Sequence, residues 1–242
     1  MNRKNWPALA LVAIASVALA TAPAFASRVP DIIAGTYILY ENGNPSCTAQ
    51  ALSIDGQINL LTAGHCTTDK KAVYSVHTTI FDAAKFDKKV TESIFYADVI
   101  RRDEEADVSV LRPVLQNSGL SVVDLATPDD IKKLIKGVDV LVAGYPGSTA
   151  SPMGELVLTD GYYTGISASW VPEIKTPMYR TSASIYYGNS GGGLYMLVDG
   201  ELKLVGIASQ TDPEMRWSNS LFATYDSITK ALQLPPKPAT DH

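Results

Sequence analysis

Three short stretches of this sequence carry side chains that could act together chemically. His65 lies in LTAGHC (61–66), Asp107 in ADVSVL (106–111) and Ser190 in GNSGGG (188–193). A serine hydroxyl is a weak nucleophile until a neighbouring base takes its proton, and that base needs an acid to fix its tautomer. Histidine, aspartate and serine therefore predict acyl transfer through a serine nucleophile, provided that the fold brings them together.

Taken singly, each stretch is a weak signal. A lone histidine is more often structural, a glycine-serine run is usually a plain loop, and an aspartate before a strand means less still. The glycines on both sides of Ser190 add one feature, because they allow a tight turn. Such a turn can present backbone N–H groups to an oxygen that becomes negative during the reaction.

The elements that would position these residues are mostly strands. Short Val-, Ile- and Tyr-rich segments separated by turn residues predict an all-β protein with two halves of similar size. The expected strands are 36–40, 47–54, 57–61, 71–80, 90–100 and 108–111 in the first half, and 139–143, 154–164, 178–183, 193–198 and 202–209 in the second. Asp55-Gly56 predicts a tight hairpin between 47–54 and 57–61, whereas residues 82–88 could be a loop or one helical turn.

Two short helices are expected between and after these strands. Thr127-Pro128-Asp129-Asp130 has an N-cap, a proline at the first helical position and acids in the first turn, and Gly137 would end that helix. Near the C-terminus, Ile228, Ala231 and Leu232 form one apolar face of a helix that starts near Thr224.

The first 26 residues have the pattern of an export signal. Residues 2–4 (NRK) give a positive start, residues 8–20 are apolar or small, and residues 24–26 (AFA) suit cleavage before Ser27. The apolar run is short for a membrane span, which needs about 20 residues, although an uncleaved anchor is the alternative. We therefore expect residues 1–26 to be a signal peptide and the protein to be secreted, either extracellular or periplasmic, without stable membrane association after cleavage.

Charge and cysteine content narrow the function classes. Loss of the signal peptide leaves 18 basic against 25 acidic residues with no basic cluster, which argues against nucleic-acid binding. In an exported chain the two cysteines, Cys47 and Cys66, predict a disulfide, with two free thiols as the alternative. A zinc site would need further ligands, and the only internal histidines are His65 and His77. We therefore expect no metal site.

Together the motifs resemble those of the trypsin/chymotrypsin family of serine endopeptidases, in its bacterial secreted form. The likeness is carried by TAGHC (62–66), DVSVL (107–111) and GNSGG (188–192), which stand in the family's chain order. Cys47 matches the family's cysteine that pairs with the one after the histidine. GIAS (206–209) resembles the segment that lines the substrate cleft, and VAGY (142–145) the opening of the second barrel. The resemblance covers about residues 32–232.

The resemblance implies two six-stranded antiparallel β-barrels with the active site between them. His65 would be the general base and then acid, Asp107 its orienter and Ser190 the nucleophile, while the N–H groups of Gly188 and Ser190 would form the oxyanion hole. We expect a first barrel in 27–118, a connector in 119–137, a second barrel with a short C-terminal helix in 138–233 and a loose tail in 234–242. We also expect protein or peptide substrates, no cofactor and a monomer.

Two departures from the family pattern bear on activation and specificity. In the animal members an aspartate pairs with a new N-terminal amine, and Asn189 stands at that position here. Residues 31–35 (DIIAG) are similar to such a terminus. Their amine would find no carboxylate to pair with. The expected substrate-binding residues are Ser184, Ser209 and Thr211. Ser184 replaces the aspartate of trypsin-like members, and Thr211 narrows the pocket. Both residues favour a substrate with a small or medium apolar residue at the scissile bond.

Two rival interpretations come from other classes. Gly188-x-Ser190-x-Gly192 also fits the nucleophile elbow of an α/β-hydrolase esterase, but that fold needs a histidine after the serine. The only one is His242, in a proline-rich tail. The second rival is a secreted protease-fold protein that binds partners and has lost catalysis, which would require a defect outside the three motifs.

Overall fold

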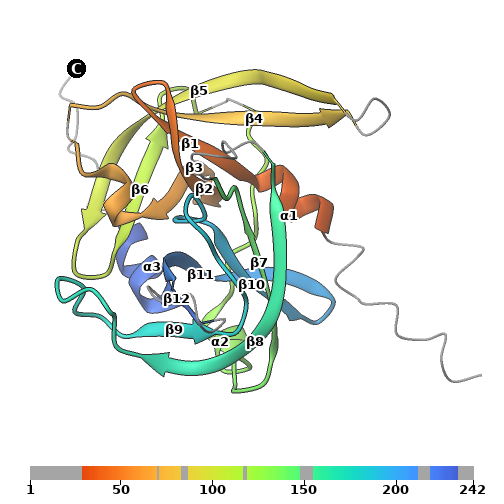
Figure 1. Cartoon of the computed structure of the whole chain (residues 1–242), viewed down its shortest axis with the longest axis vertical. Coiled ribbons are helices and arrows are strands. Elements are labelled where there is room, and N and C mark those ends of the chain that lie inside the picture. Colours follow the sequence, from red (N-terminus) through yellow and green to blue (C-terminus); the bar gives the residue numbers. More distant parts are fainter. Residues whose placement is uncertain are drawn as a thin grey trace, which may run out of the picture.

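A computed structural model of the chain describes residues 29–69, 71–82, 87–116, 119–147, 155–211 and 219–233. The expected signal peptide and the tail 234–242 lie outside these ranges. Most of the described chain forms strands arranged as two barrels, one above the other in Figure 1. The all-β prediction with two six-stranded antiparallel barrels is confirmed.

The first barrel closes in the order β1-β2-β3-β6-β5-β4. Its strands are β1 (Thr36–Glu41), β2 (Asn44–Ile54), β3 (Gln57–Ala63), β4 (Tyr74–Asp82), β5 (Asp87–Asp103) and β6 (Val108–Pro113). The predicted hairpin between β2 and β3 is confirmed, and both turn residues, Asp55 and Gly56, have positive φ. Asn42-Gly43 between β1 and β2 shares this pattern, since asparagine, aspartate and glycine tolerate the left-handed region best.

The second barrel closes in the order β10-β11-β12-β9-β8-β7. Its strands are β7 (Asp139–Gly144), β8 (Val157–Ser167), β9 (Met178–Thr181), β10 (Gly193–Val198), β11 (Glu201–Thr211) and β12 (Ser220–Ala223). Around the ring, β7 to β12 occupy the same relative places as β1 to β6. The two barrels therefore share one topology, although the sequence shows no matching internal repeat.

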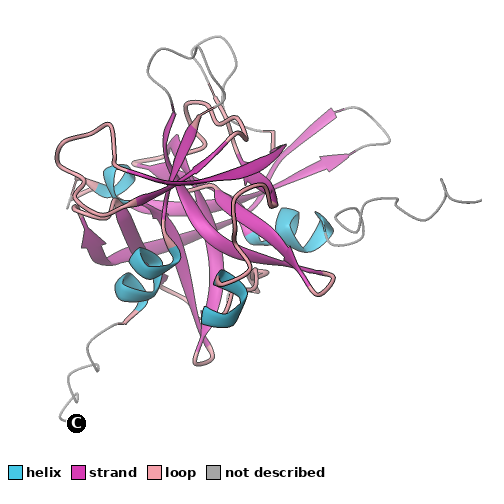
Figure 2. Ribbon diagram, turned by 90° about the horizontal axis from the view of Figure 1, so that it is seen from below, coloured by secondary structure: helices cyan, strands magenta, loops and turns pink. Residues whose placement is uncertain are grey.

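Four short helical segments accompany the barrels (Figure 2). The helix α2 (Pro128–Ile131) begins with the predicted capping box at Thr127 but ends earlier than expected, six residues before Gly137. The C-terminal helix α3 (Tyr225–Leu232) is capped by Thr224, and Ile228 and Ala231 are buried, as predicted. The structure adds the helix α1 (Val29–Gly35) and the 3₁₀ turn η1 (Gly64–Thr67), neither of which was predicted from the sequence.

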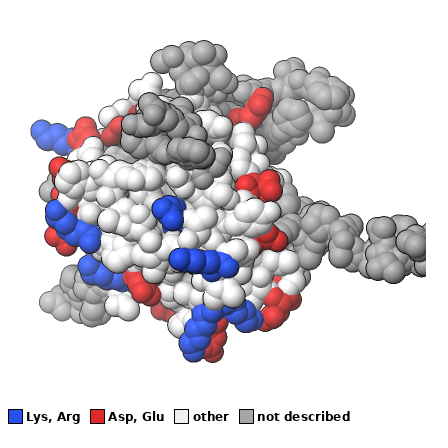
Figure 3. Space-filling model, turned by 60° about the horizontal axis from the view of Figure 1, so that its bottom comes forward, with Lys and Arg blue, Asp and Glu red and all other residues white. Residues whose placement is uncertain are grey.

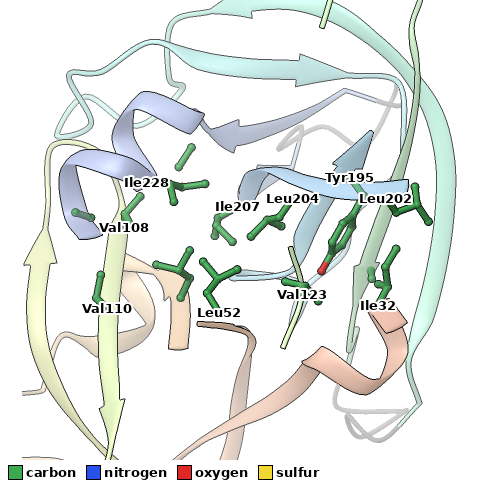
Figure 4. Packing of buried hydrophobic residues seen from close by; sticks show 14 of the residues in the cluster. Ile32, Leu52, Val108, Val110, Val123, Tyr195, Leu202, Leu204, Ile207 and Ile228 are labelled. Carbon is green, nitrogen blue, oxygen red and sulfur yellow. The ribbon is translucent and has the colours of Figure 1, made fainter. Parts of the chain in front are cut away.

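A shared apolar core joins the two barrels (Figure 4). Leu52, Val108 and Val110 of the first barrel belong to the same buried cluster as Leu204 and Ile207 of the second. Ile32 of α1 and Ile228 of α3 complete it, as Figure 4 shows. Because burial of such side chains stabilises by about 2 kcal/mol each, the core fixes one barrel against the other.

The connector between the barrels bonds to both of them. The Val123 N–H donates to the carbonyl of Ala51 on β2. On β11, the Leu204 N–H donates to the carbonyl of Asp124, and the Leu204 carbonyl accepts from the Ala126 N–H. On the face shown in Figure 3, basic and acidic side chains are interspersed around uncharged surface. Within the described ranges, no helix is long and apolar enough to cross a membrane.

Candidate active site

His65 stands where β3 ends and turns into η1. Buried apolar side chains on β3 hold this strand in the first barrel, and the chain turns directly after Ala63. Glycine suits position 64, because a Cβ here would lie 3.1 Å from the main chain of Asp107, closer than ordinary van der Waals contact. The His65 side chain is 49% exposed, so its ring reaches the surface between the barrels and is open to a substrate.

Asp107 is buried directly before β6 and accepts hydrogen bonds from several directions. Its Oδ1 lies 2.8 Å from the main-chain N of His65, and its two carboxylate oxygens lie 3.1 and 3.0 Å from His65 Nδ1. The Ser209 hydroxyl donates to Oδ2. Asp107 has φ of 51°, a conformation that costs free energy in a residue other than glycine. The bonds around the carboxylate hold the residue in this unusual conformation.

Ser190 follows a glycine turn between β9 and β10, and its Oγ lies 2.9 Å from His65 Nε2. The structure therefore joins Asp107, His65 and Ser190 in one chain of hydrogen bonds. With the carboxylate at Nδ1, the neutral imidazole carries its proton there and presents a lone pair at Nε2. That lone pair faces the Ser190 hydroxyl, which is the arrangement needed to remove the hydroxyl proton.

The turn that carries Ser190 also positions two backbone N–H groups. The carbonyl of Tyr187 accepts a hydrogen bond from the Gly147 N–H, and a trans peptide points its N–H away from its carbonyl. The Gly188 N–H therefore points away from Gly147, and the φ of 90° at Gly188 permits this orientation. Among the described residues, neither the Gly188 N–H nor the Ser190 N–H has a hydrogen-bond partner. Both donors are available to a negatively charged oxygen.

The three expected substrate-binding residues lie on two neighbouring segments. The carbonyl of Ser184 accepts a hydrogen bond from Thr159 on β8, and Thr211 pairs with Ser220 at the edge of β11. The Ser220 hydroxyl donates to the carbonyl of Ala183, which links both segments. Ser209 is buried, and its hydroxyl is committed to Asp107. Its side chain therefore supports Asp107 rather than lining the pocket.

The disulfide between Cys47 and Cys66, predicted from the two cysteines of an exported chain, is present. It ties β2 to η1, directly beside His65. These two residues and His65 are the group of possible metal ligands among the described residues. Since the sulfur atoms are bonded to each other, they cannot act as thiolate ligands.

Removing the disulfide is expected to lower the free energy of unfolding by about 3 kcal/mol, because the bond closes a loop in the unfolded chain. Denaturant titration of the variant Cys47→Ala/Cys66→Ala against the parent protein measures the loss. Reductant should shift the midpoint of the parent and leave that of the variant unchanged. Equal midpoints for the two oxidised proteins would contradict the expectation.

Several residues near the site were missed in the sequence analysis. Thr48, on β2, contacts the turn that carries Ser190. Gln210 accepts hydrogen bonds from the main chain of Trp170 and from Ser169, and thereby anchors the loop between β8 and β9. The same loop donates from Lys175 and Thr176 to the carbonyl of Glu105, two residues before Asp107. In the sequence these are isolated polar residues, and only the fold brings them to the site.

The fold and the arrangement of side chains define a peptidase of the trypsin-like class. The sequence model of the trypsin-like peptidase domain family matches residues 47–207, more than half of the chain. The protein therefore belongs to this family. Comparison with curated proteins finds no match.

Solved structures of similar fold include bacterial proteases. The HtrA-type protease AlgW with a tripeptide superimposes with a TM-score of 0.64 at 22% identity, over 85% of this chain and 61% of that one. This chain thus spans less than two thirds of the length of AlgW. The Rv3671c protease from M. tuberculosis has a TM-score of 0.63 in its active form, at 18% identity over 87% and 85% of the two chains. Its inactive form gives 0.60 at 18% identity, over 87% and 94%.

Proposed function

We propose that this protein is a secreted serine endopeptidase that hydrolyses peptide bonds through an acyl-enzyme. The observation that carries the proposal is the continuous chain of hydrogen bonds from Asp107 through His65 to Ser190. Membership of the trypsin-like peptidase family supports the substrate class. The export pattern of residues 1–26 and the disulfide support secretion, since disulfides persist in oxidising compartments.

In the proposed reaction His65 Nε2 takes the proton of Ser190 as Oγ attacks the carbonyl carbon of the scissile bond. The carbonyl oxygen becomes negative and receives hydrogen bonds from the N–H groups of Gly188 and Ser190. The protonated imidazole then gives its proton to the leaving amine, which breaks the C–N bond and leaves an acyl-enzyme. Water, deprotonated by His65, attacks the ester, and Ser190 recovers its proton as the acid product leaves.

Asp107 supports this cycle electrostatically. Its carboxylate keeps the Nδ1 proton in place and stabilises the imidazolium that forms when His65 accepts the second proton. The Ser209 hydroxyl and the main-chain N–H of His65 satisfy the remaining acceptor capacity of the carboxylate. We propose that the specificity pocket accepts a small or medium apolar residue of the substrate. Ser184 brings no charge to the pocket, and Thr211 narrows its entrance.

A fluorophosphonate probe tests the proposal, because it phosphonylates only an activated serine. The exported protein should form one covalent adduct, which peptide mass mapping places on Ser190. Pre-treatment with the probe should abolish cleavage of a peptide library. A well-folded protein that neither reacts nor cleaves peptides would contradict the proposal and favour a binding protein that has lost catalysis.

A further inference from the structure

Thr48 of the first barrel makes three hydrogen bonds to the second barrel, two of them to the turn that carries Ser190. Its main-chain N–H donates to the carbonyl of Ser190 at 2.8 Å, and its hydroxyl donates to the carbonyl of Gly188 at 2.9 Å. The same hydroxyl accepts from the main-chain N–H of Tyr145, also at 2.9 Å. Thr48 is fully buried, so water cannot replace these bonds.

The carbonyls of four successive residues fix the peptide planes of this turn. The Tyr187 carbonyl accepts from Gly147, and the Asn189 carbonyl accepts from Gly192. The other two carbonyls, of Gly188 and Ser190, are both held by Thr48. Because a peptide is planar, holding a carbonyl also fixes the direction of the next N–H. Thr48 therefore constrains two peptide planes, the one that joins Gly188 to Asn189 and the one that joins Ser190 to Gly191. The first plane lies between the two candidate oxyanion donors, and the second follows them.

The side chain of Asn189 offers the turn no ionic anchor. It is buried and neutral, and its Oδ1 has no hydrogen-bond partner among the described residues. The main chain also packs too closely for another anchor to be inserted. A Cβ on Gly191 would lie 1.9 Å from the Thr48 carbonyl oxygen, and one on Gly144 would lie 2.7 Å from Asn189 Oδ1.

Thr48 is itself fixed by the strand that leads to the base. The hydroxyl of Thr62 donates to the carbonyl of Thr48 at 2.8 Å, and Thr62 lies on β3, three residues before His65. The disulfide at Cys47 adds a covalent restraint on the adjacent residue. The first barrel thus holds both the base and, through Thr48, the turn that presents the nucleophile and the two donors.

We propose that Thr48 is a positioning residue that holds the turn Gly188–Ser190 in its oxyanion-binding conformation, an inference that rests on the proposed peptidase function. Its hydroxyl anchors the turn by a hydrogen bond, whereas the neutral Asn189 side chain cannot provide an ionic anchor. The role is indirect, since Thr48 acts through the main chain of the turn.

The test compares Thr48→Val with Thr48→Ser. Valine keeps the shape and the N–H bond but removes the hydroxyl, whereas serine keeps the hydroxyl. We expect Thr48→Val to lower kcat by about 10- to 100-fold, part of the loss seen when an oxyanion donor is removed. KM should change less than about threefold, as for an interaction made in the transition state. Thr48→Ser should restore most of kcat.

The matched control is Thr36→Val. Thr36 is also buried, on β1, and its hydroxyl lies within hydrogen-bond distance of the Ile32 carbonyl and of Gln50 Oε1 rather than of the turn. Its kcat should stay at the parent value even if its melting temperature falls. An unchanged kcat in Thr48→Val, or equal losses in the valine and serine variants, would overturn the role of the hydroxyl.

Hydrogen exchange of residues 186–192 gives a readout that does not need activity. The N–H groups of Asn189, Gly191 and Gly192 are hydrogen-bonded within and beneath the turn. They should exchange faster in Thr48→Val than in the parent, Thr48→Ser or Thr36→Val. If exchange is faster in Thr48→Val but the parent protein does not cleave peptides, the result would support the positioning role and contradict the proposed function. Unchanged exchange would overturn the positioning role whatever the activity.

Discussion

Ser190→Ala is expected to lower kcat on a peptide substrate by about 10⁶-fold, as removal of a serine nucleophile does in enzymes of this chemistry. Alanine offers no oxygen to form the acyl-enzyme. The fold should survive, because the one hydrogen bond of the Ser190 hydroxyl among the described residues is to the His65 ring, while its main chain keeps the bond to Thr48. Steady-state kinetics against a parent protein titrated for active sites measure the loss, and thermal melting verifies the fold.

The double variant Ser190→Ala/His65→Ala makes this prediction sharper. If Ser190 and His65 act as one unit, the double variant should be no slower than Ser190→Ala alone. The remaining rate would come from the N–H groups of Gly188 and Ser190, which neither replacement removes. Losses that add would mean that the two side chains act independently, and the proposed acyl-enzyme route would have to be abandoned.

Local features of the sequence predict much of this fold. Asp55-Gly56 and Asn42-Gly43 predict turns because few other residues tolerate their positive φ. The capping box at Thr127 and the apolar face of α3 are likewise set by residues within a few positions of one another. The order of His65, Asp107 and Ser190 resembles a known family, and this likeness, rather than strand spacing, predicted the two barrels.

Features that depend on contacts between distant residues could not be predicted. Thr48 and Gly188 are 140 residues apart, and Ser209 and Asp107 are 102 apart. In the sequence Thr48 is one of several polar residues in a strand, and nothing local marks it as buried. The strand β12 (Ser220–Ala223) was missed because four residues carry little periodicity, and pairing with β9 and β11 stabilises it.

The helix α1 shows that tertiary contacts decide the structural role of a segment. Residues 31–35 resemble a terminus that inserts its amine, yet Ile32 is buried inside α1, and its carbonyl accepts a hydrogen bond from Thr36. The side chain of Ile32 packs with Val123 and Leu204 in the core between the barrels. The segment therefore contributes packing to the core between the barrels, and Asn189 offers no carboxylate that could bind an inserted amine.

Asp107→Asn is expected to lower kcat by about 10⁴-fold at neutral pH with little change in the fold. The amide fills nearly the same volume, but its NH₂ group can donate to His65 Nδ1. The imidazole proton would then move to Nε2, which faces the Ser190 hydroxyl and could no longer accept its proton. The imidazolium would also lose the carboxylate that stabilises it. Kinetics with peptide substrate and the rate of fluorophosphonate labelling should fall together.

Ser209→Ala distinguishes the charge of Asp107 from its placement. This variant removes one donor to Oδ2 but leaves the carboxylate and the bonds from the His65 main chain and ring. Since one hydrogen bond to a charged group is worth about 2 kcal/mol, we expect kcat to fall by no more than about 30-fold. A loss as large as that of Asp107→Asn would mean that the position of the carboxylate matters more than its charge. An Asp107→Asn variant that keeps most of its activity would instead assign Asp107 to the fold and leave His65 to act without an orienting acid.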